Sequence, residues 1–163
     1  MSEVNRTETK GAESKYVYVT YIRTTPEKLW KALLEPEFTR QYWFDSAQES
    51  EWKPGSPWRI KFSDGRVTDS GEVVEIDPPK KLVLKWRHEI DPELTGEGYS
   101  RMTYELEPRG ELVKLTVTHV MDKSESKFIT AVSGGWPIIL ASLKSLLETG
   151  ESFEESRRMP KGI

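Results

Sequence analysis

The sequence has no cysteine and only two histidines among its 163 residues. Without cysteine the chain can form no disulfide bond, thiol nucleophile or cysteine metal site. Long apolar runs are also missing: no stretch approaches the roughly 20 residues of a membrane span, and the N-terminus lacks the apolar core of a signal peptide. We therefore expect no membrane span. The absence of cysteine agrees with a reducing compartment, and the expected location is cytoplasmic.

A strong charge of either sign is missing as well. The formal net charge is −3, although charged residues make up 31% of the chain, and no basic run resembles a nucleic-acid footprint. We therefore expect no nucleic-acid partner. Hydrophobic residues make up 36%, a balance typical of a soluble globular protein of one domain.

The two ends of the chain differ from its middle. Residues 1–14 contain a single aliphatic residue, Val4, which predicts a disordered N-terminal tail. We expect one domain over residues 15–150, followed by a frayed C-terminal tail over residues 151–163.

Two short helices are predicted after a first strand at Tyr16–Arg23. Thr25 can cap the first helix, with Pro26 in its first turn, and Pro36 stops it. A second short helix is predicted over Glu37–Trp43.

A run of strands follows, separated by turn residues such as Asp64-Gly65. Apolar and polar residues alternate along the predicted strands, which are Ala47–Trp52, Pro57–Phe62, Val67–Ile76, Lys81–Glu89, Gly98–Glu107 and Leu112–Met121, with a polar loop at Ile90–Glu97. Short connections favour antiparallel pairing, with one face of the sheet exposed to water.

The last third changes to a helical period. Apolar residues from Trp136 to Leu147 form one stripe, whereas Pro137 is unfavourable inside a helix and tolerated in its first turn. We therefore predict a main helix that begins near Gly135 or Trp136 and ends at Gly150, and a separate short helix over Ser124–Val132. The only long apolar element that can cover the sheet is this main helix, so the pattern predicts an α+β fold in which a curved antiparallel sheet wraps around a C-terminal helix.

Several stretches are similar to a known family. They are Thr25–Trp30, Asp64-Gly65, Gly71–Leu82, Gly135-Trp136 and Leu143–Glu148, of which Gly71–Leu82 is the most specific. On these residues the chain resembles the START-like (SRPBCC, helix-grip, birch-pollen-allergen-like) superfamily, in the branch similar to the C-terminal domain of the activator of heat-shock protein 90 ATPase. The resemblance implies about seven antiparallel strands, a cavity between sheet and helix, and ligands such as lipids, polyketides or flavonoid-like compounds. It implies no fixed catalytic motif.

Six tryptophans are spread over different predicted elements, and large aromatic side chains often line apolar pockets. The predicted ligand-binding residues are Trp30, Phe38, Tyr42, Trp43, Trp58, Ile60, Trp86, His88, Met102, Tyr104, His119, Trp136 and Leu140. The alternative for each aromatic residue is ordinary packing in the core.

The two histidines share the inner side of their strands with apolar residues. His88 and His119 can therefore be polar groups in a pocket, or histidines that only bond to backbone or water. Gly71 can mark a bulge, which leaves the sides of Asp69 and Glu72 open. No ligand spacing indicates a metal site, and we expect neither metal nor other cofactor.

Three functions remain. The first is binding of a small hydrophobic or amphipathic ligand. The second is a cyclase- or hydratase-type enzyme that uses the same cavity and relies on His88 or His119. The third is a co-chaperone-like interaction module, which needs an exposed patch.

Overall fold

Eight strands form one antiparallel sheet in the computed structural model, which describes residues 6–10 and 13–160. The strands are β1 (Arg6–Lys10), β2 (Glu13–Ile22), β3 (Ser46–Ser50), β4 (Pro57–Phe62), β5 (Val67–Asp77), β6 (Lys81–His88), β7 (Ser100–Arg109) and β8 (Leu112–Met121). Their order in the sheet is β1-β2-β8-β7-β6-β5-β4-β3. The helices are α1 (Pro26–Leu34), α2 (Pro36–Tyr42), α3 (Pro92–Thr95) and α4 (Lys127–Thr149), followed by a 3-10 turn, η1 (Glu154–Ser156).

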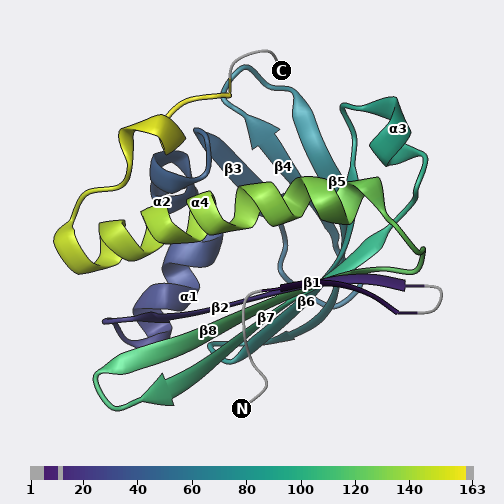
Figure 1. Ribbon diagram of the computed structural model, residues 1–163. Coiled ribbons are helices and arrows are strands. Elements are labelled where there is room, and N and C mark those ends of the chain that lie inside the picture. The colour runs from purple at the N-terminus through teal and green to yellow at the C-terminus, as the bar shows by residue number, and fades with distance from the viewer. Residues whose placement is uncertain (1–5, 11–12, 161–163) are drawn as a thin grey trace.

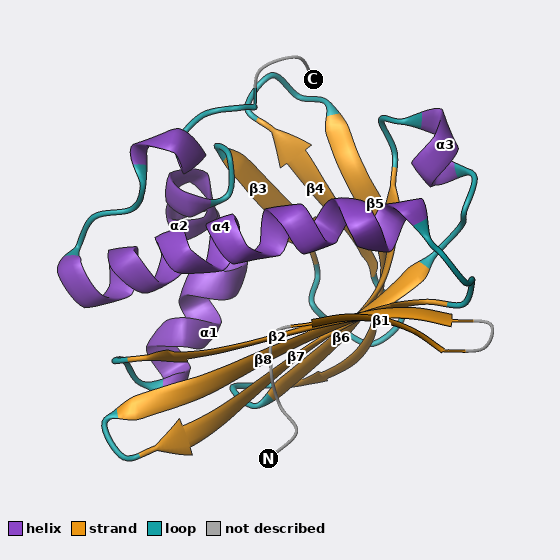
Figure 2. Ribbon diagram, viewed as in Figure 1, coloured by secondary structure: helices purple, strands orange, loops and turns teal. Residues whose placement is uncertain are grey.

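The sheet curves around α4, which runs along its concave face (Figure 1). Helices α1 and α2 close one end of the concave side, and α3 lies at the other end (Figure 2). The prediction of an α+β helix-grip fold is confirmed. The described sheet has one strand more than the seven that the resemblance implies, because β1 pairs along β2 at the edge.

Local signals position the first two helices as the sequence predicts. The Thr25 hydroxyl accepts a hydrogen bond from the Lys28 amide at 3.2 Å, and Pro26 occupies the first turn. Glu35 has extended backbone angles and ends α1, and Pro36 begins α2 directly after it.

Both predicted tails differ from the structure where it describes them, and residues 1–5, 11–12 and 161–163 lie outside the described residues. Arg6–Lys10 forms β1 inside the segment predicted to be disordered, because its backbone completes a ladder with β2. At the other end, residues 151–160 pack against the domain instead of fraying. The Phe44 amide donates to the Ser156 carbonyl at 2.7 Å, and the buried Ser142 and Ser156 hydroxyls lie 2.7 Å apart.

The prediction of two C-terminal helices is wrong, because α4 is continuous from Lys127 to Thr149 with Pro137 inside it. One proline and two glycines lower the helix propensity of the middle of α4. Apolar side chains before and after this stretch are buried on the same face of the helix, and their burial outweighs the loss of propensity. The buried residues are Phe128, Ile129, Trp136, Ile139, Leu140, Ser142 and Leu143. The predicted polar loop Ile90–Glu97 likewise contains the short helix α3.

Gly71 occupies a position where a side chain has no room. A Cβ atom on Gly71 would lie 1.9 Å from the backbone oxygen of Lys85. Its neighbours across the sheet are Trp58 on β4 and Trp86 on β6, whose rings pack 4.7 Å apart.

Among the described residues, α4 is the one helix that is long and apolar enough to cross a membrane by length and composition. One third of its apolar window is buried inside the protein, and the core helix of a globular domain passes the same test. Length and composition alone therefore do not assign it to a membrane.

Candidate functional site

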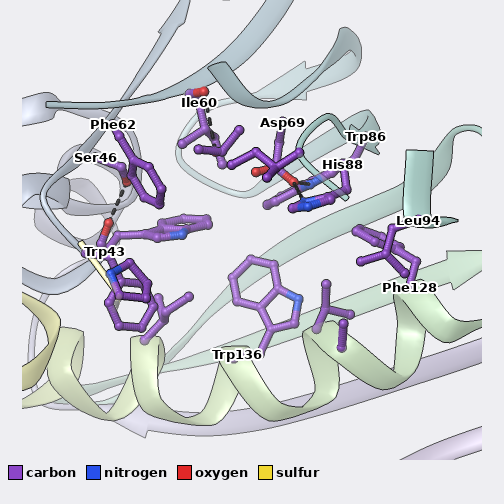
Figure 3. A pocket seen from close by; sticks show the side chains of 18 residues that line it. Trp43, Ser46, Ile60, Phe62, Asp69, Trp86, His88, Leu94, Phe128 and Trp136 are labelled. Carbon is purple, nitrogen blue, oxygen red and sulfur yellow. Dashed lines mark hydrogen bonds and ion pairs between the residues drawn. The ribbon is translucent and has the colours of Figure 1, made fainter. Parts of the chain in front are cut away.

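A pocket of about 220 Å³ opens between α4 and strands β4 to β6, next to the loop after α2. Its lining is mostly apolar and comes from elements far apart in the sequence. The lining residues are Trp43, Phe44, Ser46, Ile60, Phe62, Thr68, Asp69, Trp86, His88, Ile90, Leu94, Phe128, Ala131, Val132, Gly135, Trp136, Ile139 and Pro160. Figure 3 shows Trp136 standing on α4 and facing Trp86 and the Asp69–His88 pair across the space.

Three tryptophans form one aromatic wall of this pocket. The ring centroids of Trp43 and Trp136 lie 5.3 Å apart in an edge-to-face arrangement, and Trp86 lies 6.0 Å from Trp43 and 5.7 Å from Trp136. These separations are those of favourable aromatic pairs. The three rings hold one another in place and present flat apolar surfaces to a bound molecule.

Asp69 and His88 place a polar pair in this apolar lining. They are directly opposite each other on β5 and β6, and their side chains are 14% and 19% exposed. Oδ2 of Asp69 accepts a hydrogen bond from Nε1 of Trp86 at 2.7 Å and lies 3.6 Å from Nδ1 of His88. Interaction with this carboxylate raises the pKa of His88 above its ordinary value, against the opposing effect of burial.

His119 has a different environment and belongs to the core. It is fully buried, and Nε1 of Trp136 donates to its Nδ1 at 3.1 Å. The other ring nitrogen, Nε2, therefore carries the proton and donates to the Ser100 hydroxyl at 2.8 Å, which in turn donates to the Trp86 carbonyl at 2.8 Å. Burial lowers the pKa of His119 to about 3, so the ring is neutral and acts as a fixed link between β8, β7 and α4.

The structure brings five of the thirteen predicted residues into the pocket lining: Trp43, Ile60, Trp86, His88 and Trp136. The other eight lie outside the lining: Trp30, Phe38, Tyr42, Trp58, Met102, Tyr104, His119 and Leu140. Most of these are fully buried and fill the space between sheet and helix, so the hollow follows only the N-terminal half of α4, from Phe128 to Ile139. These residues therefore pack in the core, which is the alternative that the sequence left open.

Asp69 is the pocket residue whose side the sequence left open. The irregularity of β5 against β6 falls between Val73 and Glu75, not at Gly71. Asp69, Gly71 and Val73 therefore alternate regularly on the inner side, whereas Glu72 faces outward and lies 3.8 Å from Lys85. Alternation counted back from Val73 is the signal that assigns Asp69 to the pocket.

Other lining residues come from segments without a periodic signal. Ile90 lies just before α3, Leu94 lies within it, and Pro160 comes from the segment after η1. Glu97 ties the α3 segment to α4, because its carboxylate accepts hydrogen bonds from the Ser126 hydroxyl at 2.6 Å and the Lys127 amide at 2.8 Å. A loop-borne carboxylate thus caps the helix that carries Trp136.

Within residues 6–10 and 13–160, no group of three histidine, aspartate or glutamate side chains could hold a metal ion. The Asp69–His88 pair supplies two potential ligands, one fewer than such a group needs. Its chemistry is that of hydrogen bonding and proton exchange.

Comparison with known proteins places this architecture in a family. The sequence pattern of the family described as Activator of Hsp90 ATPase homolog 1-like protein (AHSA1) matches residues 23–148. The chain belongs to this family. The resemblance drawn from the sequence is thereby confirmed, and the matched segment of this AHSA1-like protein runs from the end of β2 to the end of α4. No curated protein sequence matches the chain.

Solved structures share the fold at low sequence identity. Protein MLL2253 from Mesorhizobium loti is 24% identical, with a TM-score of 0.69 over 82% of this chain and 96% of that one. The Aha1 dimer from Colwellia psychrerythraea is 20% identical, with a TM-score of 0.68 over 85% and 98%. CalU16 from Micromonospora echinospora is 16% identical, with a TM-score of 0.68 over 88% and 83%. These similarities establish the helix-grip fold of the AHSA1-like protein.

Proposed function

We propose that this protein binds a small, mainly apolar molecule in the pocket between α4 and strands β4 to β6. The observation that carries the proposal is a hollow of about 220 Å³ walled by Trp43, Trp86 and Trp136 inside an otherwise packed core. Such a hollow removes apolar ligand surface from water, which stabilises the complex by roughly 25 cal/mol per Å².

The size of the pocket limits the ligand. An apolar cavity of about 150 Å³ accommodates benzene, so this pocket suits a ligand of about two fused rings. Long-chain lipids and flavonoids exceed this volume unless the α3 segment or the chain after η1 moves aside. For a ligand of about ten non-hydrogen atoms we expect a Kd between about 1 μM and 1 mM.

Two neighbouring glycines on α4 provide a matched test. Neither residue has an atom within 4 Å of an added Cβ, but Gly135 lines the pocket and Gly134 does not. We expect 1-naphthol, added to isotopically labelled protein in an NMR titration, to bind the wild type and Gly134→Leu with similar Kd. Gly135→Leu fills the pocket and weakens binding at least tenfold. Equal binding by all three proteins, or no binding of either naphthalene or 1-naphthol by the wild type, contradicts the proposal.

The two other functions stay predictions. An enzyme using this cavity would depend on His88, because both ring nitrogens of His119 are already engaged in the core. A co-chaperone role is tested by adding a heat-shock protein 90 homologue to labelled protein: shifted amide signals support it, and unchanged signals count against it.

A further inference from the structure

The pocket carries its polarity at one place. Asp69 and His88 face each other across β5 and β6, and both are largely buried. The lining around them is aromatic or aliphatic, apart from the hydroxyl groups of Ser46 and Thr68. Those two hydroxyls are occupied, since Ser46 donates to the Trp43 carbonyl at 2.6 Å and Thr68 lies 3.5 Å from the Ile60 carbonyl oxygen.

The atoms of the pair are used unequally. In the part of the chain that the structure describes, both interactions of the Asp69 carboxylate fall on Oδ2, one with the Trp86 indole and one with Nδ1 of His88. Oδ1 is therefore the acceptor left for a ligand. Because Nδ1 of His88 faces the carboxylate, Nε2 on the far side of the ring is the nitrogen left for a ligand.

We propose that the Asp69–His88 pair is the recognition element of this pocket and selects aromatic ligands that carry a hydroxyl group. With the His88 ring protonated on both nitrogens, the ligand hydroxyl donates to Oδ1 of Asp69 and accepts from Nε2–H of His88, while its rings lie against the tryptophans. This inference rests on the proposed function, because it assigns a ligand class to the same pocket.

The charge of the pair favours a neutral hydroxyl over other polar groups. A ligand carboxylate would place a second negative charge beside Asp69 in a largely buried site. A ligand ammonium would compete with His88 for the same carboxylate. A hydroxyl group both donates and accepts, so it satisfies both partners without adding charge.

The test compares three probes that share two fused rings: naphthalene, 1-naphthol and 1-naphthoic acid. Their Kd values are measured by NMR titration at about pH 6, below the raised pKa of His88, for the wild type, Asp69→Asn and His88→Gln. Asp77→Asn is the matched control, since Asp77 is an exposed carboxylate at the end of the same strand and lies outside the pocket. Amide spectra of the free variants verify that each is folded.

We expect the wild type and the Asp77 variant to bind 1-naphthol at least tenfold more tightly than naphthalene, and 1-naphthoic acid less tightly than 1-naphthol. Asp69→Asn and His88→Gln should each lower the preference for 1-naphthol over naphthalene by about tenfold. The Kd of naphthalene should stay within about twofold of the wild-type value. If the wild type binds all three probes equally, prefers the acid, or keeps its preference in both pocket variants, the inference is overturned while the binding function stands. If no probe binds, both fall.

Discussion

At the scale of single residues, the two histidines show how one fold gives one residue type opposite properties. His88 sits beside a carboxylate at the pocket, and His119 is sealed among aromatic rings. The ordinary pKa of histidine is about 6.5. The carboxylate raises the pKa of His88 above this value, whereas burial lowers that of His119 to about 3.

We therefore predict different titrations of the two rings by NMR. Carbon-bound ring protons of His88 should titrate with a pKa above about 6.5, and Asp69→Asn should lower it. The ring signals of His119 should stay unchanged between pH 5 and 8. A His119 midpoint near 6.5 would show that this ring is open to water and would contradict the core network.

The same shifts predict how stability depends on pH. The folded state disfavours protonation of His119, so its contribution is complete above about pH 6.5 and is lost as the pH falls towards about 3. His88 acts in the opposite sense, because its stabilisation is complete below about pH 6.5 and is lost as the pH rises through its raised pKa. Urea unfolding of His88→Gln should show a smaller loss of stability between pH 6 and 9 than the wild type; identical profiles would contradict the ion pair.

Gly71 gives a second prediction at this scale. Gly71→Ala places a methyl group 1.9 Å from the Lys85 backbone oxygen, so β5 and β6 must separate or shift. We expect a loss of more than about 3 kcal/mol in unfolding free energy, measured by urea titration. Gly134→Ala in α4 is the control, since Gly134, like Gly71, has no positive φ, but its Cβ would meet nothing within 4 Å. A loss in Gly71→Ala no larger than in Gly134→Ala would show that steric exclusion at Gly71 is unimportant.

At the scale of elements, the first turn of α4 uses a distant carboxylate in addition to its own N-cap, Ser126, whose hydroxyl accepts from the Ile129 amide at 3.1 Å. Glu97 accepts hydrogen bonds at the first turn, whereas the neighbouring Glu93 only forms an exposed ion pair with Lys127 at 2.6 Å. We predict that Glu97→Ala lowers the unfolding free energy by about 1–2 kcal/mol and Glu93→Ala by less than about 0.5 kcal/mol, as measured by urea titration. A reversed order would contradict the role of Glu97 as an acceptor for the first turn of α4.

The elements also show how far the sequence predicts this molecule. Alternation along the strands, the Thr25-Pro26 helix start and the apolar stripe after Trp136 are local patterns, and each predicts its element. Continuity of α4 through Pro137 is not local, because it depends on burial of Phe128 and Ile129 at one end and Leu140 and Leu143 at the other. Propensity alone therefore divides a helix that tertiary packing holds together.

The site is less predictable than the fold for the same reason. Strand alternation assigns Trp86 and His88 to the concave side, but it assigns Met102 and Tyr104 there equally. Which inner residues line a hollow depends on how the rings from Trp58 and Tyr42 fill the remaining space. Segments without periodicity, such as α3 and the chain after η1, also contribute lining residues through contacts that span the whole fold.

At the scale of the whole molecule, the fold combines a packed core with a hollow beside the N-terminal half of α4. The fully buried Trp58, Tyr104 and Met102 belong to the core and lie outside the pocket lining. The pocket lies where α4, the strands β4 to β6, the α3 segment and the C-terminal segment meet. The three-tryptophan wall is therefore part of both the core and the site, and ligand binding should be reported by some indole groups and not by others.

The most direct measurement is an NMR titration of the six tryptophan indole N–H signals with 1-naphthol. The account predicts that the signals of Trp43, Trp86 and Trp136 shift together and saturate, while those of Trp30 and Trp52, which lie outside the pocket, stay within experimental error. Shifts confined to Trp30 and Trp52, or equal small shifts of all six that do not saturate, would contradict a binding pocket beside the N-terminal half of α4.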